Sequence, residues 1–175
     1  MMISRMQAVL VATLLAAPAW AHGPTPQDLT HSVEIDAPAE TVWEILKDPA
    51  TISDWHPDVT SATMEGEGPG AKRTTELESG TVGDGIDIIN DDNLTTRWRL
   101  AEENRDVIPV SFYTNTLVVK ETDAGSEVTW RASFFRADTT NEPEEQYSDE
   151  AAVTFMDAYI TEGLNGLKEQ AETGS

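Results

Sequence analysis

The chain has 175 residues and no cysteine, which excludes disulfide bonds, thiolate catalysis and cysteine-bound metals or clusters. Its 32 acidic residues outnumber 11 basic ones, and the formal net charge is −21 at pH 7. This charge disfavours nucleic acid and anionic membrane surfaces as partners, and it suits either solubility in a salty habitat or a basic protein partner.

The first 21 residues have the pattern of a secretory signal peptide. Arg5 provides a positive start, residues 8–17 form an apolar run, and the Ala-Trp-Ala sequence that ends at Ala21 matches a cleavage site with small residues. An apolar run of about ten residues is too short to span a bilayer core of about 30 Å. We therefore expect cleavage after Ala21 and a periplasmic mature protein that begins with His22; an uncleaved membrane anchor is the alternative.

The mature chain, 175 minus 21 or 154 residues, is long enough for a single hydrophobic core. We expect an extended arm over residues 22–28, because this segment contains two prolines and a glycine, and one domain over residues 29–175. The alternation of side chains from Leu29 to Ile35 predicts a strand over residues 29–36. No later apolar run reaches membrane-spanning length, so the protein is not expected to be embedded in a membrane.

Two short helices are predicted after this strand. Pro38 fits the first helical position, apolar residues from Val42 onwards recur at helical spacing, and Pro49 ends the first helix. Residues 51–55 form a second helical turn. Pro57 then forces the chain into an extended exit.

Five or six strands are expected to follow. The segments with strand character are residues 58–65, 71–78, 86–90, 94–101, 111–121 and 127–137. We interpret the glycine-rich segments 66–70 and 80–85 as turns, and residues 123–125 as the loop of the clearest hairpin. The pattern predicts a meander of sequential antiparallel strands.

The chain ends in one long helix. Residues 138–147 are polar and acidic and are expected to form a solvated loop, after which Ser148 is a helix N-cap with Asp149 and Glu150 in the first turn. A helix of about 24 residues would reach roughly 36 Å, enough to cross a whole sheet. The side chains expected to be buried are Ala152, Met156, Tyr159, Ile160, Leu164 and Leu167.

The predicted fold class is therefore α+β, with a curled antiparallel sheet of six to seven strands around a long C-terminal helix and two short helices after the first strand. This order of elements and the segment 35–59, IDAPAETVWEILKDPATISDWHPDV, resemble the START and polyketide cyclase/dehydrase superfamily, which has the helix-grip fold. Further matches are GPGAKR from Gly68, GSEVTW from Gly125 and the segment 163–167. The resemblance covers residues 29–171.

A narrower resemblance is to the periplasmic MxaD-type proteins, which are accessory factors of bacterial methanol oxidation. It depends on HGPTPQ from His22, YTNTLVVK from Tyr113 and WRASFF from Trp130. The resemblance implies a role in helping a periplasmic methanol dehydrogenase work with its cytochrome c acceptor.

A sheet curled around a helix implies an internal apolar cavity that could hold a small hydrophobic ligand. The candidate lining residues are Trp55, His56, Arg73, Trp98, Tyr113, Leu117, Trp130, Phe134, Met156 and Tyr159. The alternative is that these side chains simply fill the core. We expect a non-catalytic protein that binds such a ligand, acts as an accessory factor to a dehydrogenase–cytochrome c system, or does both.

The alternative function is a cyclase- or dehydratase-like enzyme. In that case His56 is the candidate general base, with Asp54, Glu76 or Arg73 adjusting its pKa. The chain has no triad-like spacing, nucleophile elbow or phosphate loop. A structural or exposed role for His56 is the competing interpretation, because this residue sits next to a proline in a tight corner.

No cofactor and no metal are expected from the sequence, with one weak exception. After cleavage, the α-amine and imidazole of His22 could chelate copper(II), and His31 or His56 would have to complete the site. The chain has no HxH or HExxH pattern, and a glycine and a proline directly after His22 favour a loose arm without a metal.

Overall fold

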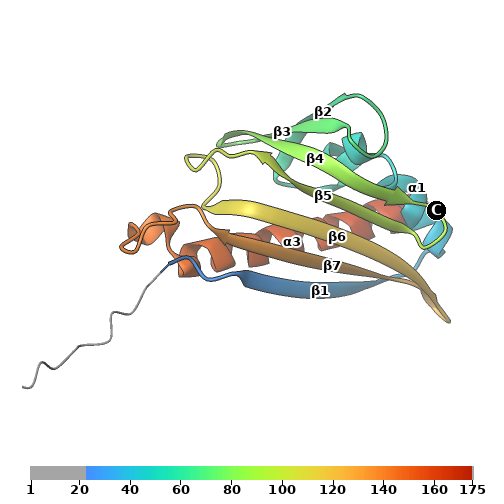
Figure 1. Cartoon of the computed structure of the whole chain (residues 1–175). Helices are drawn as coiled ribbons and strands as arrows, with labels where there is room; N and C mark the ends of the chain where they lie inside the picture. Colours follow the sequence, from blue (N-terminus) through green and yellow to red (C-terminus); the bar gives the residue numbers. More distant parts are fainter. Residues whose placement is uncertain (1–22, 175) are drawn as a thin grey trace, which may run out of the picture.

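The computed structural model describes residues 23–174. The predicted signal peptide and His22, on which the copper hypothesis depends, lie outside these residues. One seven-stranded antiparallel sheet with the order β1-β7-β6-β5-β4-β3-β2 curls around a long helix (Figure 1). The strands are β1 (Gln27–Ile35), β2 (Val59–Glu65), β3 (Lys72–Leu77), β4 (Gly80–Asn90), β5 (Thr95–Glu102), β6 (Val110–Thr122) and β7 (Gly125–Arg136).

The helices occupy the concave side and one end of this sheet. The long helix α3 (Asp149–Thr173) packs mainly on β1 and β7, and the C-terminus of α3 lies at the same end of the molecule as α1 (Figure 1). The short elements are α1 (Ala39–Leu46), η1 (Pro49–Thr51), α2 (Ile52–Trp55) and η2 (Glu145–Tyr147). The helix-grip fold class predicted from the sequence is confirmed.

The core lies between α3 and the inner face of the sheet. On β7 the inward side chains are every second residue, and Val128, Trp130 and Phe134 have no exposed surface. The same alternation holds on β1, where the odd-numbered residues from Leu29 to Ile35 are the more buried ones. Burial of these apolar side chains is the main source of the fold's stability.

The start of α3 follows the predicted N-cap. The Ser148 hydroxyl accepts a hydrogen bond from the Ala151 N–H at 3.2 Å and satisfies one of the free donors of the first turn. All six side chains expected on the buried face of α3 contribute to the core, with Tyr159 only partly buried.

The segment 80–85 is a strand, and its interpretation as a turn was wrong. The β3–β4 hairpin turns within two residues, Glu78 and Ser79, because Leu77 pairs with Gly80. Gly83 lies where the β4–β5 register shifts, and a Cβ there would be only 2.9 Å from the Cβ of Glu102. The glycine therefore permits close strand packing where the sequence pattern indicated a turn.

Three boundaries also differ from those predicted. Strand β1 begins at Gln27, within the segment expected to be an extended arm. Pro38 is the N-cap of α1 and not its first helical residue. Gly125 pairs with Thr122 and so belongs to β7, which leaves a two-residue loop in the β6–β7 hairpin. These shifts are one or two residues long. They occur at the ends of elements, where local capping and strand pairing decide the boundary.

Candidate functional site

A buried polar cluster lies on the inner face of β3, β4 and β6. Arg73 donates to Asp84 Oδ2 through Nε at 3.0 Å and Nη2 at 2.7 Å, and its Nη1 donates to the Pro49 carbonyl at 3.0 Å. The Thr75 hydroxyl donates to the same carboxylate oxygen at 3.2 Å, and the Tyr113 hydroxyl donates to Asp84 Oδ1. The cluster links η1 to three strands, and each charge has its partner.

The electrostatics of the cluster keep Tyr113 protonated. Burial raises the pKa of the Tyr113 phenol well above its usual value, and the adjacent charge of Asp84 and their hydrogen bond raise it further. The sequence interpretation identified Arg73 and Tyr113 but missed Asp84, because this residue lies in the segment taken for a turn. The alternation of Val82, Asp84 and Ile86 was the signal that could have found it.

Aromatic rings surround Trp130 in the centre of the core. Its indole N–H donates to Asn115 Oδ1 at 2.8 Å, so its one polar atom is satisfied. Four rings pack edge-to-face with Trp130. The distances between ring centroids are 5.6 Å for Trp98, 5.9 Å for Tyr159, 6.1 Å for Trp55 and 6.2 Å for His56. Such edge-to-face contacts are favourable beyond the area they bury.

The interior is a packed core, in place of the open cavity expected from the sequence. Leu117, Trp130, Phe134 and Met156 are fully buried and fill the space between sheet and helix. The free volume beside Trp98, Tyr113, Met156 and Tyr159 is only about 20 Å³. This is roughly the room of one water molecule. The ten candidate lining residues therefore do come together, but they pack mainly against one another.

His56 is buried, with 2% of its surface exposed, and both ring nitrogens are occupied. The Asp58 N–H donates to Nδ1 at 3.3 Å, and Nε2 lies 3.0 Å from the carbonyl oxygen of Tyr159. Because an N–H can only donate and a carbonyl can only accept, the proton resides on Nε2. Burial lowers the pKa of His56 from 6.5 to about 4, the nearby charge of Arg73 also lowers it, and the bond to Tyr159 opposes both.

This geometry does not suit a general base, because neither ring nitrogen is free to take a proton from a substrate. Of the three residues proposed to adjust the pKa of His56, Arg73 does so through its charge. Glu76 accepts a hydrogen bond from Ser61 at 2.9 Å on β2, and residues 23–174 contain no hydrogen bond from Asp54 or Glu76 to His56.

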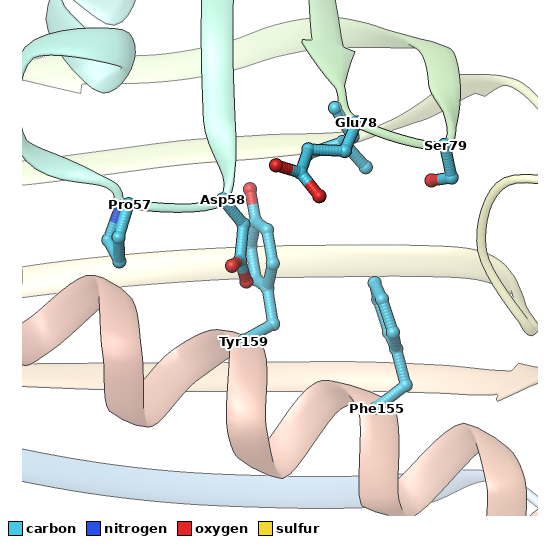
Figure 2. A pocket seen from close by; sticks show the side chains of 7 residues that line it. Pro57, Asp58, Glu78, Ser79, Phe155 and Tyr159 are labelled. Atoms are coloured by element: carbon cyan, nitrogen blue, oxygen red, sulfur yellow. The ribbon is translucent and has the colours of Figure 1, made fainter.

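A groove of about 430 Å³ opens over the N-terminal half of α3 (Figure 2). Phe155 and Tyr159 project into it from α3, with their rings stacked at 5.9 Å between centroids and 19° between planes. The remaining lining residues are Pro57 and Asp58, which precede β2, and Leu77, Glu78 and Ser79 of the β3–β4 hairpin.

The two aromatic side chains separate this groove from the core. Leu77, Phe155 and Tyr159 line both the groove and the small internal cavity of about 20 Å³. A ligand in the groove would therefore rest on these rings and on Leu77. Of the groove residues, the sequence interpretation named only Tyr159, because the others become neighbours only through the topology of the sheet.

The described residues also bear on metal and membrane partners. Within residues 23–174, no group of three or more His, Asp or Glu residues lies close enough to hold a metal ion. The Nε2 atom of His31 lies 3.0 Å from Asp157 Oδ1. None of the helices in this part of the chain combines the length and apolar character needed to cross a membrane.

Comparison with known proteins supports this architecture. The sequence model of the family described as polyketide cyclase/dehydrase and lipid transport matches residues 26–172. No curated protein matches the chain. A solved structure of an uncharacterised protein from Bacillus thuringiensis has 25% sequence identity and a TM-score of 0.69, and the match covers 83% of this chain and 98% of that one.

Two other solved structures share the fold at lower identity. The protein XoxI from Bacillus cereus is 24% identical with a TM-score of 0.69, over 82% of this chain and 94% of that one. The Zhui aromatase/cyclase from Streptomyces sp. R1128 is 18% identical with a TM-score of 0.68, over 85% and 94%. The second of these is an enzyme and the first carries no stated activity, so the fold by itself does not decide whether this chain catalyses a reaction.

Proposed function

The chain belongs to the polyketide cyclase/dehydrase and lipid transport family, and from this premise we propose that it is an exported, non-catalytic helix-grip protein that binds a small hydrophobic ligand. The observation that carries this proposal is the groove over Phe155 and Tyr159, with its volume of about 430 Å³. This volume lies within the usual range for small-molecule sites, roughly 300–1,000 Å³.

The shape of the groove supports ligand binding at its floor. The stacked rings of Phe155 and Tyr159 provide apolar surface, and Leu77 and Pro57 add to it. Rotation of the two rings would join the groove to the small cavity beneath it and admit a longer ligand. Met156 also lines that cavity, and its flexible side chain can adapt to an occupant.

The state of His56 supports a non-catalytic role over a cyclase or dehydratase. A buried imidazole with a pKa of about 4 and two backbone partners holds α2 against α3 and offers no free base to the groove. The enzyme alternative through His56 requires a rearrangement that frees one ring nitrogen.

The test is binding of a neutral fluorescent aromatic compound, N-phenyl-1-naphthylamine, to the purified mature protein. We expect saturable binding that falls at least about tenfold in Phe155→Ala, since burying an aromatic ring contributes more than 1.4 kcal/mol. Phe112→Ala is the matched control, because Phe112 is 66% exposed on the sheet and does not line the groove. Equal loss in both variants, or no binding by the unaltered protein, would contradict the proposal.

A second role, as accessory factor to a periplasmic dehydrogenase–cytochrome c system, has support from the net charge of −21, which suits a basic partner. The MxaD-type resemblance points in the same direction. Association with a methanol dehydrogenase and its cytochrome c is measurable by titration at low and high salt. Export is tested by cell fractionation and by mass spectrometry of the exported protein, whose mass should match a chain that begins at His22.

A further inference from the structure

The groove over Phe155 and Tyr159 has a charge as well as a shape. The carboxylates of Asp58 and Glu78 stand side by side at the sheet side of the groove, because these residues flank the paired Val59 and Leu77, and no basic side chain is among its lining residues (Figure 2). Resting on the ligand-binding function proposed above, we propose that this groove selects organic cations, in which an ammonium group is attached to an apolar body.

The two carboxylates are available to such a ligand. Neither Asp58 nor Glu78 belongs to an ion pair within residues 23–174. In the core beneath, the charge of Arg73 acts on Tyr159, but Arg73 is 3% exposed and its charge is matched by Asp84. A ligand cation would therefore meet uncompensated negative charge at the rim of the groove.

The aromatic floor points independently to the same class of ligand. Cations are attracted to the negative faces of aromatic rings, and Phe155 and Tyr159 present two rings to the groove. The Tyr159 hydroxyl extends towards the rim near Asp58 (Figure 2), and it makes no hydrogen bond to the described residues. This oxygen can accept an N–H from a bound ammonium group.

A metal ion fits this groove less well than an organic cation. Two carboxylates and one phenol are fewer ligands than a divalent ion needs, and no cluster of three ligating residues occurs within residues 23–174. The apolar side chains Pro57, Leu77 and Phe155 would also be left without a partner. Ligands with a carboxylate head group are disfavoured, because the protein carries a net charge of −21.

Three ligands with one apolar body test the inference by calorimetric titration: 1-naphthylmethylamine, 1-naphthylmethanol and 1-naphthoate. We expect the ammonium ligand to bind about tenfold more tightly than the neutral alcohol, and the anion to bind most weakly. Raising the salt from about 20 mM to about 500 mM should reduce the preference for the amine and leave the alcohol unaffected.

Isosteric substitutions show whether Asp58 and Glu78 cause the preference for the amine over the alcohol. Asp58→Asn and Glu78→Gln should each weaken amine binding about threefold, and together they should remove the difference between amine and alcohol. Both substitutions keep the size of the side chain. The contact between residue 58 and His56 is also kept, since it is made by the backbone N–H of Asp58. Glu162→Gln removes the same charge from an exposed position of α3 outside the groove and should have little effect.

The outcomes separate the two proposals. Equal affinity for amine and alcohol would overturn the selection of cations and leave ligand binding intact. An equal loss in Glu162→Gln and in Glu78→Gln would also overturn it, because the preference would then come from the net charge of the whole protein. If none of the three ligands binds, the proposed ligand-binding function itself is contradicted.

Discussion

At the scale of single residues, burial decides which polar groups can take part in chemistry. His56 is neutral at pH 7 because the interior disfavours its charged form, and its nitrogens serve a backbone N–H and a backbone carbonyl. His56, which the sequence suggested as a catalytic base, thus has a structural role in this fold, because its hydrogen bond to Tyr159 connects the end of α2 to α3. Phe155 and Glu78, which lacked any sequence motif, line the accessible groove instead.

The first prediction concerns the pH dependence of stability. The folded-state pKa of His56 is about 4, below the value of 6.5, so the unfolded chain binds more protons between these two pH values. Stability must therefore fall as the pH decreases from about 6.5 to about 4. Each tenfold change in proton affinity is worth about 1.4 kcal/mol, so the loss from His56 should total about 3 kcal/mol.

Urea unfolding of the protein and of His56→Gln across this pH range measures the effect. Carboxylates titrate in both proteins, so the difference between their two curves isolates the imidazole. We expect the variant to lack most of the decline attributed to His56, whatever its stability at pH 7. Parallel curves for the two proteins would show that His56 does not remain neutral in the folded state.

The second prediction concerns the buried pair of Arg73 and Asp84. Asp84→Leu leaves a buried guanidinium without its counter-ion, and it should lower the free energy of unfolding by about 3–5 kcal/mol. Arg73→Met combined with Asp84→Leu removes both charges and should recover much of this loss. A residual cost of about 1–3 kcal/mol is expected, because the Tyr113 hydroxyl loses its acceptor in both variants.

Denaturant titrations of the two single variants and the double variant provide this comparison. If the double variant is as unstable as the sum of the singles, the two side chains do not act as a pair, and the ionic interpretation of the cluster is wrong.

At the scale of elements, two glycines fix the distance between α3 and the short helix α2. A Cβ at Gly166 would overlap the carbonyl oxygen of Trp55, and one at Gly163 would lie 2.7 Å from His56 Cδ2 and 2.8 Å from Trp130 Cζ3. The absence of side chains here lets the helices approach closely. The corner at Trp55 and His56 is therefore clamped against α3.

The third prediction follows from this contact. In an isolated helix, replacing glycine by alanine is favourable by about 1 kcal/mol. In Gly166→Ala the clash with a backbone carbonyl should outweigh this gain and lower the free energy of unfolding by about 1–3 kcal/mol. Asn165→Ala, at the neighbouring exposed position, should be neutral or slightly stabilising. A more stable Gly166→Ala protein would mean that α2 and α3 do not pack as closely as described.

The elements that the sequence predicted well are those with local signals. The N-cap at Ser148, the alternation on β1 and β7 and the length of α3 all depend on residues within a few positions of one another. The first part of β4, residues 80–85, was misinterpreted because Gly80, Gly83 and Gly85 are typical of turns when considered alone. Their role becomes apparent only when β3 and β5 are placed beside them, which is information about tertiary contacts.

At the scale of the whole molecule, the candidate site could be predicted only in part. Periodicity brought the inward-facing aromatic residues together, as at Trp98 and Trp130, but it could not reveal that their side chains close the interior. The groove combines residues from three segments, 57–58, 77–79 and 155–159, that are far apart in the chain. Only the sheet order and the crossing of α3 make them neighbours.

The net charge of the whole molecule gives the last prediction. The proposed removal of the signal peptide, and Arg5 with it, would leave ten basic residues against 32 acidic ones, a formal charge of −22. Such an excess destabilises the compact state through repulsion, and salt screens this repulsion. Salt also weakens favourable surface pairs such as Lys168 with Glu172, but each of these contributes only about 0–1 kcal/mol.

Because repulsion involves many more charges than the few surface pairs, we expect sodium chloride to stabilise the protein. Raising its concentration from about 20 mM to about 500 mM at pH 7 should increase the Tm by several degrees, since about 1 kcal/mol shifts the Tm of a domain this size by roughly 2–4 °C. At pH 4.5, where part of the carboxylates are protonated, the increase should be smaller. An unchanged or lower Tm at pH 7 would mean that the carboxylates are spaced widely enough for local pairs to dominate.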